Sequence, residues 1–292
     1  MLAIVILAGG RSKRFGTNKL IYKVEGESMI KRVFKAASEI TQNIYLSVKD
    51  RAQADILLGV CDGFSGVILD AFKEINGPIN GVITSLNTLS CGEVVTIPGD
   101  MPFIDSKSLS KFIDTCKSLD ANSGSIYWPS GWVDALIQYH KREKAVKHAS
   151  LYTIRGAMSR SSDILRASKK VYYIPISHLT KNYRTFININ TPEDLSKNNT
   201  VLSDSMPKIK HVKEDIIENF LLATNMLKND LPMAAEYYLF EGKKYEEEEL
   251  YTLAMHAYKD AKICFEKLNK YTRAKDLDMK IAHIKSLLNY HR

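Results

Sequence analysis

Short apolar runs alternate with helix-patterned segments through the first part of the chain. The apolar runs are rich in branched residues and end at glycine, proline or polar positions, as strands buried on both faces do. They lie at 2–8, 43–48, 66–69 and 93–97. Between them, apolar positions recur every three to four residues at 28–40, 53–60, 79–89 and 106–119. This alternation predicts βαβ units, and therefore a Rossmann-like, mostly parallel sheet with helices on both faces.

Further strands are predicted beyond residue 120. The segments 125–129 and 133–140 have the pattern of two adjacent strands joined around Ser130-Gly131. The segment 186–190, "FININ", has the pattern of a last strand before a helix start, where Pro192 stands near the first position and two acids follow. The α/β part of the chain is expected to close there.

The pattern changes near residue 197. The segment 197–208, "KNNTVLSDSMPK", is polar and aperiodic, which is typical of a linker. Beyond it we predict helices at 212–227, 233–245, 246–268 and 271–288, with the acid run Glu246–Glu249 at a helix N-terminus. We therefore predict an α/β domain at 1–198 and a small all-α domain at 199–292. The helices of the second domain resemble tetratricopeptide hairpins over about one and a half repeats.

Composition adds a few constraints. The chain has 292 residues, 45% of them hydrophobic, which is enough for about two domains. The net charge of +8 is spread along the chain, so we attribute it to solubility, and local clusters must carry any argument for an anionic ligand. The four cysteines are far apart without the spacing of a zinc site, and no run reaches the ~18 apolar residues of a membrane span. We expect a soluble cytoplasmic protein with neither nucleic acid nor membrane as a partner.

The first strand–helix turn carries the strongest local cluster of cations. It reads "LAGGRSKRFGTNKL", residues 7–20, and holds Arg11, Lys13, Arg14 and Lys19 beside three glycines. Glycines let backbone N–H groups approach phosphate oxygens, and the cations neutralise them. The turn has neither the G-x-x-x-x-G-K-[ST] nor the G-x-G-x-x-G pattern. It predicts a phosphate-binding loop, with a solvated basic turn as the alternative.

A lone acid follows the buried strand at 93–97. In "VVTIPGDMPFID", Asp100 stands between a glycine and Met101-Pro102, separated from the apolar run by Pro98 and Gly99. Ligands of open α/β sheets bind at the carboxyl ends of strands, so Asp100 is expected near the phosphate-binding loop. A carboxylate beside phosphates suits Mg²⁺, which keeps few protein ligands. The alternative is a cap for the helix at 106–119, for which Asp105 or Ser106 is better placed.

Four segments resemble the motifs of a known family. "LAGGRSKRFGTNKL" resembles the L-A-G-G-x-S-x-R-[FM]-G-x-x-K signature of the nucleotidyltransferase family that includes molybdenum cofactor guanylyltransferase. "GPINGVITSL" resembles its G-P-[LI]-x-G segment, "GDMPFI" its [GC]-D-[MT]-P-F motif, and "FININTPEDL" its N-x-N-T-P-E-[DE]-L. The motifs occur in the family's order over residues 1–196, and the resemblance does not extend to 200–292.

The resemblance implies a set of nucleotide contacts. Leu7, Ala8 and Gly9 would contact guanine and ribose through their backbone. The pair Gly9-Gly10 is the form found in guanylyl-transferring members of the family. Asp70, seven residues before Gly77, matches an acid that touches the nucleotide.

The resemblance also implies a phosphate and metal site. Lys19 would bind the triphosphate with help from Arg14, and Asp100 would hold Mg²⁺. Asn190, and Asn188 more weakly, would complete the metal or phosphate site from the last strand.

The chain departs from the family in two places. The family often has an asparagine after the second strand, where "YLSVKD" offers Ser47 or Lys49. Its H-P-L segment, which faces the second substrate, is "GWVDAL" here, so the acceptor is less securely indicated than the nucleotide. Arg155 and Arg160 could bind the acceptor phosphate, and they could equally be ordinary helix-face residues.

These features predict a Mg²⁺-dependent guanylyltransferase that moves GMP from GTP to the phosphate of molybdopterin and releases pyrophosphate. The acceptor phosphate is largely dianionic near neutral pH and needs no general base. Alternatives are transfer to a sugar phosphate or cobinamide phosphate, or a nucleotide-sensing scaffold. The C-terminal helices would pack on the first domain, self-associate, or bind a protein partner, and the sequence leaves these roles open.

Overall fold

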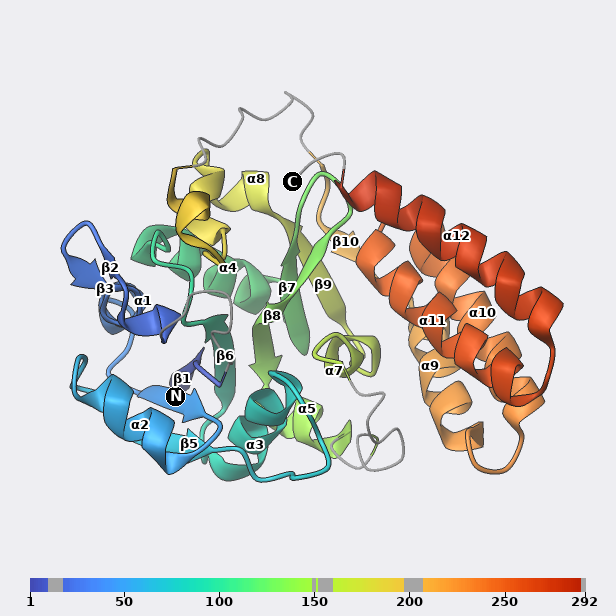
Figure 1. Ribbon diagram of the computed structural model, residues 1–292, viewed down its shortest axis with the longest axis horizontal. Coiled ribbons are helices and arrows are strands. Elements are labelled where there is room, and N and C mark those ends of the chain that lie inside the picture. The colour runs from blue at the N-terminus through green and yellow to red at the C-terminus, as the bar shows by residue number, and fades with distance from the viewer. Residues whose placement is uncertain (10–17, 149–150, 152–159, 197–206, 290–292) are drawn as a thin grey trace.

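The computed structural model describes residues 1–9, 18–148, 151, 160–196 and 207–289. Within these residues the main sheet has eight strands in the order β10-β9-β7-β8-β6-β1-β4-β5 (Figure 1). Their bounds are β1 Leu2–Leu7, β4 Ile44–Val48, β5 Gly66–Leu69, β6 Glu93–Pro98, β7 Ser123–Tyr127, β8 Val133–Lys141, β9 Val171–Pro175 and β10 Lys210–His211. A small hairpin of β2 (Lys23–Val24) and β3 (Glu27–Ser28) lies outside this sheet.

The sheet is mostly parallel, as the sequence predicts. β1 pairs in parallel with both β4 and β6, β4 pairs in parallel with β5, and β7 with β9. β8 runs antiparallel between β6 and β7, and β10 runs antiparallel to β9. The carboxyl ends of β1, β4, β5 and β6 therefore meet at one edge, which is where such sheets bind ligands.

Helices cover both faces of the sheet, because alternate residues of each strand point to opposite sides. Ala3, Val5 and Leu7 of β1 join one hydrophobic cluster, which includes α3 (Ile79–Thr88). Ile4 and Ile6 join the other. That second cluster takes in α1 (Met29–Ser38), α2 (Arg51–Leu58) and α4 (Ser106–Ser118). The predicted fold class is thus confirmed.

The residues before α4 and α1, where the sequence favours a cap, differ in what they do. Asp105 caps α4, because its side chain accepts a hydrogen bond from the Ser108 amide at 2.7 Å. Ser28 precedes α1 but makes no side-chain cap bond. Three short helices did not show in the pattern, namely α5 (Arg142–Ala145), α7 (Asp163–Arg166) and α8 (Ile176–Leu179). They are too short to present a periodic apolar stripe.

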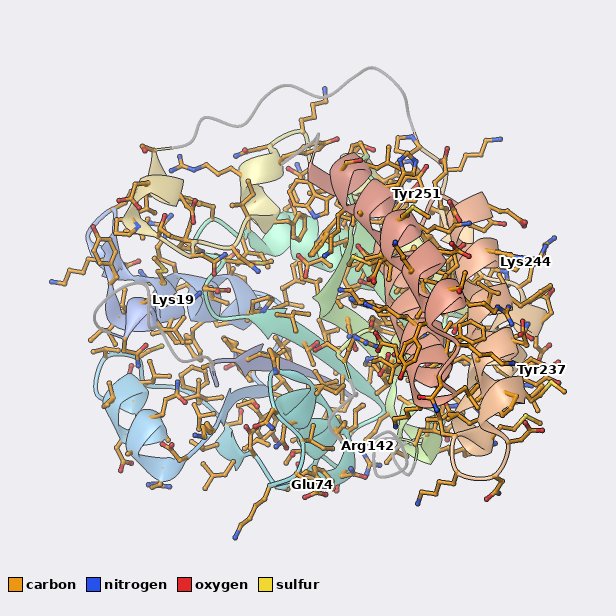
Figure 2. The ribbon with its side chains drawn as sticks, turned by 45° about the vertical axis from the view of Figure 1, so that its right-hand side comes forward. Lys19, Glu74, Arg142, Tyr237, Lys244 and Tyr251 are labelled. Atoms are coloured by element: carbon orange, nitrogen blue, oxygen red, sulfur yellow. The ribbon has the colours of Figure 1, made fainter. Side chains whose placement is uncertain are left out.

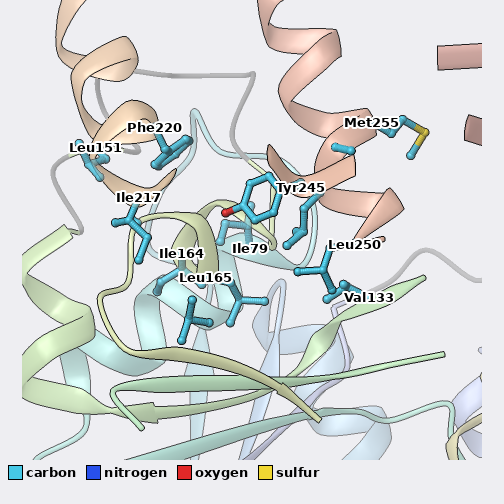
Figure 3. Close-up of a cluster of buried hydrophobic side chains, with 14 of the residues drawn as sticks. Ile79, Val133, Leu151, Ile164, Leu165, Ile217, Phe220, Tyr245, Leu250 and Met255 are labelled. Carbon is cyan, nitrogen blue, oxygen red and sulfur yellow. The ribbon is translucent and has the colours of Figure 1, made fainter. Parts of the chain in front are cut away.

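The C-terminal region is helical, as expected. Its helices are α9 (Glu214–Met226), α10 (Leu231–Glu247), α11 (Tyr251–Lys267) and α12 (Tyr271–Asn289). They share a hydrophobic cluster with α3, α7 and the sheet. Figure 3 shows Phe220 and Tyr245 from the helices above Ile164 and Leu165 of α7. The helices therefore pack on the α/β part through a continuous apolar core, and the boundary at 198 stays a prediction.

A buried ion cluster lies at the same interface. The Arg166 guanidinium of α7 is fully buried and donates to both carboxylate oxygens of Glu241 in α10, at 2.8 and 2.6 Å. It also donates to Asp260 of α11 and to Asp163, each at 2.9 Å. Burial without these acids would be very costly for a charged group, so the cluster specifies how α7 meets the two helices.

Two predicted elements are wrong. Residues 187–190 form no strand, because this segment follows a 3₁₀ turn at Tyr183–Phe186 and crosses the carboxyl edge of the sheet instead of joining its ladder. The acid run does not begin a helix either. Glu246 and Glu247 end α10, and Glu249 has a positive φ of 55° in the turn before α11. The linker predicted at 197–208 lies mostly outside the described residues.

Candidate nucleotide site

Lys19, Asp100 and Asn190 meet at the carboxyl edge of the sheet. Asp100 lies two residues beyond β6, and Lys19 begins a 3₁₀ turn that Asn18 caps. The Lys19 ammonium forms an ion pair with the Asp100 carboxylate and donates to the Asn190 side-chain oxygen at 3.0 Å. The three residues come from the start, middle and end of the α/β part, so the fold brings together three residues that the sequence predicts for one site. Figure 2 shows Lys19 on the far side of the molecule from the C-terminal helices.

The residues around Asp100 explain why a glycine precedes it. A Cβ on Gly99 would lie 3.3 Å from the Leu7 carbonyl oxygen and 3.4 Å from Ile30, closer than side chains normally pack. Gly99 thus lets β6 turn tightly against the end of β1, where its amide donates to the Leu7 oxygen at 2.9 Å. On the other side, Arg32 donates to the Pro102 carbonyl at 2.7 Å. Asp100 therefore stands on a short turn held from both sides.

The segment at 187–190 completes this turn. The Ile189 amide donates to the backbone oxygen of Asp100 at 2.8 Å, which places Asn190 beside Lys19. Asp194 then accepts hydrogen bonds from the amides of Asn190 and Thr191, each at 2.9 Å. The "NTPED" sequence thus forms a capping box that fixes the direction in which Asn190 leaves the backbone.

Two oxygens at this edge are consistent with a bound cation. The Oδ1 atoms of Asp100 and Asn188 are buried and have no hydrogen-bond partner among the described residues. A buried acceptor without a donor is costly, and a Mg²⁺ ion would satisfy it. The described residues contain no cluster of three or more histidine, cysteine or acidic side chains that could hold a metal. A single carboxylate with amide oxygens suits Mg²⁺, because that ion keeps several waters or phosphate oxygens.

The end of β1 is held by a residue that the sequence did not single out. The Gln53 side chain donates to the Ala8 carbonyl at 2.5 Å and accepts from the Lys49 amide at 3.3 Å. The Ala8 amide donates to the Ser47 carbonyl at 2.7 Å. The polar backbone atoms of Ala8 are thus engaged within the protein, whereas the next residue, Gly9, is exposed. No sequence signal marks Gln53, since it lies on a helix at an ordinary polar position.

Gly9 has room around it. A Cβ there would come no closer than 3.6 Å to the Lys49 amide, which is an ordinary contact. The fold therefore does not require glycine at this position. A requirement for glycine would come from a ligand that approaches the backbone closely.

Asp70 lies at the end of β5, on the same edge. Burial raises its pKa to about 6, although Lys49 acts in the opposite direction. Asn80 of α3 holds the residues after Asp70 by donating to the carbonyls of Phe72 and Ile75 at 2.6 and 3.1 Å. Asn80 therefore supports the loop behind Asp70, and it stands within the "GPINGVITSL" motif.

The two candidate replacements for the family asparagine behave differently. Ser47 is buried, and its hydroxyl lies where a Cβ on Gly81 would be only 2.5 Å away. Ser47 thus contributes to the packing of α3 on β4. Lys49 lies at the edge, where its charge acts on Asp70.

Several predicted residues are not brought to this site. Arg160 is directed toward the C-terminal helices, where it forms an ion pair with Asp260 at 2.7 Å. Figure 1 shows α7, which follows Arg160, beside those helices. The structure therefore gives no support to Arg160 as an acceptor-binding residue. Gly10, Arg14 and Arg155 lie outside the described residues.

The "GWVDAL" segment also meets the C-terminal helices. Gly131 has a positive φ of 75°, and a Cβ there would lie 2.5 Å from the Tyr251 ring. The Val133 amide donates to the Thr252 hydroxyl at 3.0 Å. The start of α11 is thus fitted to the β7–β8 hairpin, and the glycine is required by that close approach.

A mostly parallel sheet with a lysine, a carboxylate and an amide at its carboxyl edge is typical of nucleotide-binding α/β proteins. The profile of the MobA-like NTP transferase domain matches residues 4–169, more than half of the chain. The chain belongs to this family, and the protein is a nucleotidyltransferase.

Individual relatives agree with this assignment. The chain is 29% identical over 197 residues to a probable molybdenum cofactor guanylyltransferase of Thermococcus gammatolerans, covering 66% of this chain and 96% of that protein. A protein of the same description from Pyrococcus furiosus is 28% identical over 208 residues, covering 70% of this chain and all of that one. About a third of this chain thus lies outside these matches.

One solved structure shows the same fold. Molybdopterin-guanine dinucleotide biosynthesis protein A from Archaeoglobus fulgidus superposes with a TM-score of 0.56 at 23% identity. The superposition covers 67% of this chain and 95% of that one.

The described part of this chain contains no helix long and apolar enough to cross a bilayer.

Proposed function

We propose that this protein transfers GMP from GTP to the phosphate of molybdopterin and releases pyrophosphate. The observation that carries the proposal is the meeting of Lys19, Asp100 and Asn190 beside a buried carboxylate oxygen that has no hydrogen-bond partner among the described residues. The names of the relatives from Thermococcus gammatolerans and Pyrococcus furiosus support guanylyl as the transferred group and molybdenum cofactor as the acceptor.

Charge neutralisation is the main task of the site in this proposal. The acceptor phosphate attacks the α-phosphorus of GTP, so two polyanions must be held together in line. Lys19 would exchange part of its contact with Asp100 for the triphosphate and would stabilise the charge on the leaving pyrophosphate. Gly9 would let the base approach the backbone, and Asp70 would contact the nucleotide from β5. An acceptor that is already dianionic requires no side chain to remove a proton.

Mg²⁺ is part of the proposal. Asp100 and Asn190 are the residues that would hold it, with Asn188 as a further oxygen donor. When bound, the ion would withdraw charge from the phosphates and favour loss of pyrophosphate.

The proposal is tested by incubating the full chain with Mg²⁺ and GTP and measuring pyrophosphate. The acceptors compared are molybdopterin, a sugar phosphate and cobinamide phosphate. We expect release that depends on molybdopterin. Pyrophosphate release with only a sugar phosphate or cobinamide phosphate would refute molybdopterin as the acceptor, but the protein would still be a nucleotidyltransferase. A chain that binds GTP but releases pyrophosphate with none of them would favour a nucleotide-sensing role.

A further inference from the structure

The outer face of α10 carries a largely apolar seam that the other described elements leave partly exposed. Met233, Tyr237, Phe240 and Lys244 follow one another at spacings of four, three and four residues, so they lie along one side of the helix. Met233 is 44% exposed and Phe240 is 45% exposed. Figure 2 shows Tyr237 and Lys244 on the outer edge of the molecule, away from Lys19.

This seam borders a groove. A cavity of about 440 Å³ is lined by residues of α10 and by one residue of α9, namely Asn219, Met233, Glu236, Tyr237, Leu239, Phe240 and Lys243. Single exposed apolar residues are normal on a protein surface, but several gathered in one groove mark an interaction site. The helical spacing of the seam indicates that its occupant is another helix.

The charged residues beside the seam can pair with the same residues of a second copy of α10. Glu236 and Lys243 are seven residues apart, so both lie on the same flank of α10, and both line the groove. When two copies of one helix pack antiparallel, each flank position meets a position of the same flank two turns away. An acid and a base at that separation then pair twice, once on each side of the symmetry axis.

We propose that α10 is the interface of a twofold-symmetric dimer, packed antiparallel against α10 of a second copy. In this register Tyr237 lies opposite the partner's Phe240, and Met233 lies opposite the aliphatic stem of the partner's Lys244. Glu236 lies opposite the partner's Lys243. Arg273 of α12 already holds the Glu236 carboxylate, with one contact at 3.0 Å, and so fixes the acid in place on its own surface.

A second copy fits this face better than an unrelated partner, because the complement of each feature is on the same helix. The apolar residues of the seam would face the seam of the second copy, and Glu236 would face the oppositely charged Lys243 of the second copy. Such isologous contacts are the commonest way in which identical chains associate. The surface lies on the opposite side of the molecule from Lys19, so the dimer leaves the nucleotide site open.

The experiment measures the mass of the full chain in solution by sedimentation or light scattering over a range of concentrations. We expect a dimer that dissociates on dilution. Phe240→Asp should abolish it, and Lys243→Glu should raise its dissociation constant at least about tenfold, because an acid would then face Glu236 on both sides of the axis. Met279→Asp is the matched control, since Met279 is a 62% exposed methionine of α12 outside the seam.

A charge-swap rescue separates the interface from general damage. Adding Glu236→Lys and Arg273→Glu to Lys243→Glu reverses both the pair within the chain and the pair across the axis, so the dimer should return. Thermal melting and pyrophosphate release of each variant check that the fold is kept. A wild-type chain that remains monomeric at high concentration would overturn the proposal. A dimer unaffected by both Phe240→Asp and Lys243→Glu would overturn it equally.

Discussion

The two carboxylate oxygens of Asp100 are in different situations. Oδ2 is paired with Lys19, whereas Oδ1 is buried without a partner among the described residues. Within the described part of the chain the Asp100 side chain makes no other hydrogen bond, and the backbone of the turn is held by Gly99 and Ile189. Asp100 is therefore expected to serve the ligand more than the fold.

We predict that Asp100→Ala lowers turnover by about two orders of magnitude or more, because the carboxylate that would anchor Mg²⁺ is lost. The melting temperature should stay close to that of the wild type. Pyrophosphate release at saturating Mg²⁺ is the measurement, and circular dichroism is its control. Turnover like that of the wild type would show that Asp100 holds no catalytic ion.

Gly9 tests the choice of nucleotide. GTP should bind at least about 30-fold better than ATP or CTP, because a guanine pocket leaves polar groups unpaired with other bases at roughly 1–3 kcal/mol each. Gly9→Ala should erode this preference without loss of stability, since the protein leaves room for a methyl group there. Competitive binding of the three nucleotides with Mg²⁺ measures both effects. Equal affinity of the unmodified protein for GTP and CTP would contradict the guanylyl assignment.

Asp70 makes stability depend on pH. Burial raises its pKa from 3.8 to about 6, so the folded state binds the proton more tightly than the unfolded state. Stability from this group is therefore present below about pH 4 and is lost as the pH rises through 6. We predict that Asp70→Asn melts at a higher temperature than the wild type above pH 6, and that the difference disappears near pH 4. A constant difference across this range would exclude Asp70 as its source.

At the scale of elements, the buried Arg166 cluster joins α7 to α10 and α11. Replacing Arg166 leaves Glu241, Asp260 and Asp163 buried without the guanidinium that they contact. We predict that Arg166→Met lowers the free energy of unfolding by about 3–5 kcal/mol.

Arg160→Met is the matched control, because the Arg160 side chain is partly exposed and contacts only the edge of the cluster. It should lower the free energy of unfolding much less. Urea unfolding of both variants gives the comparison. Equal losses would mean that burial of the charge is not what makes Arg166 important.

At the scale of the whole molecule, the C-terminal helices and the α/β part share one core. Phe220 and Tyr245 pack in the same cluster as Val5 of the central strand. The sequence pattern predicts residues 1–198 as a separate domain, but the shared core leads us to expect otherwise. We predict that a chain cut after residue 198 is insoluble or melts without cooperativity, because the cut exposes this cluster and leaves Arg166 without Glu241 and Asp260. A truncated chain that melts in one sharp transition would instead show that residues 1–198 fold as an independent domain.

The sequence by itself determined the alternating strands and helices and their mostly parallel sheet. It also pointed to Lys19 and Asp100, because glycine, proline and charged residues at strand ends are local signals of a ligand-binding turn, whereas Asn190 was indicated only by the resemblance to the nucleotidyltransferase family. Burial on both faces of a strand and helical periodicity also depend on the pattern of neighbouring residues. The strands β1, β4, β5 and β6 could therefore be predicted without knowledge of the strands with which they pair.

Only the tertiary structure decided what distant residues do to one another. "FININ" has the composition of a strand, but its backbone pairs with Asp100 and so becomes part of the site. Gln53 holds the end of β1 from a helix more than forty residues away in sequence. The sequence allowed Arg160 to bind an acceptor phosphate, but in the structure Arg160 forms an ion pair with Asp260 of α11. A local pattern records which positions are buried, whereas the partner that a polar group meets depends on how separate elements pack, and that geometry is not encoded within any one segment.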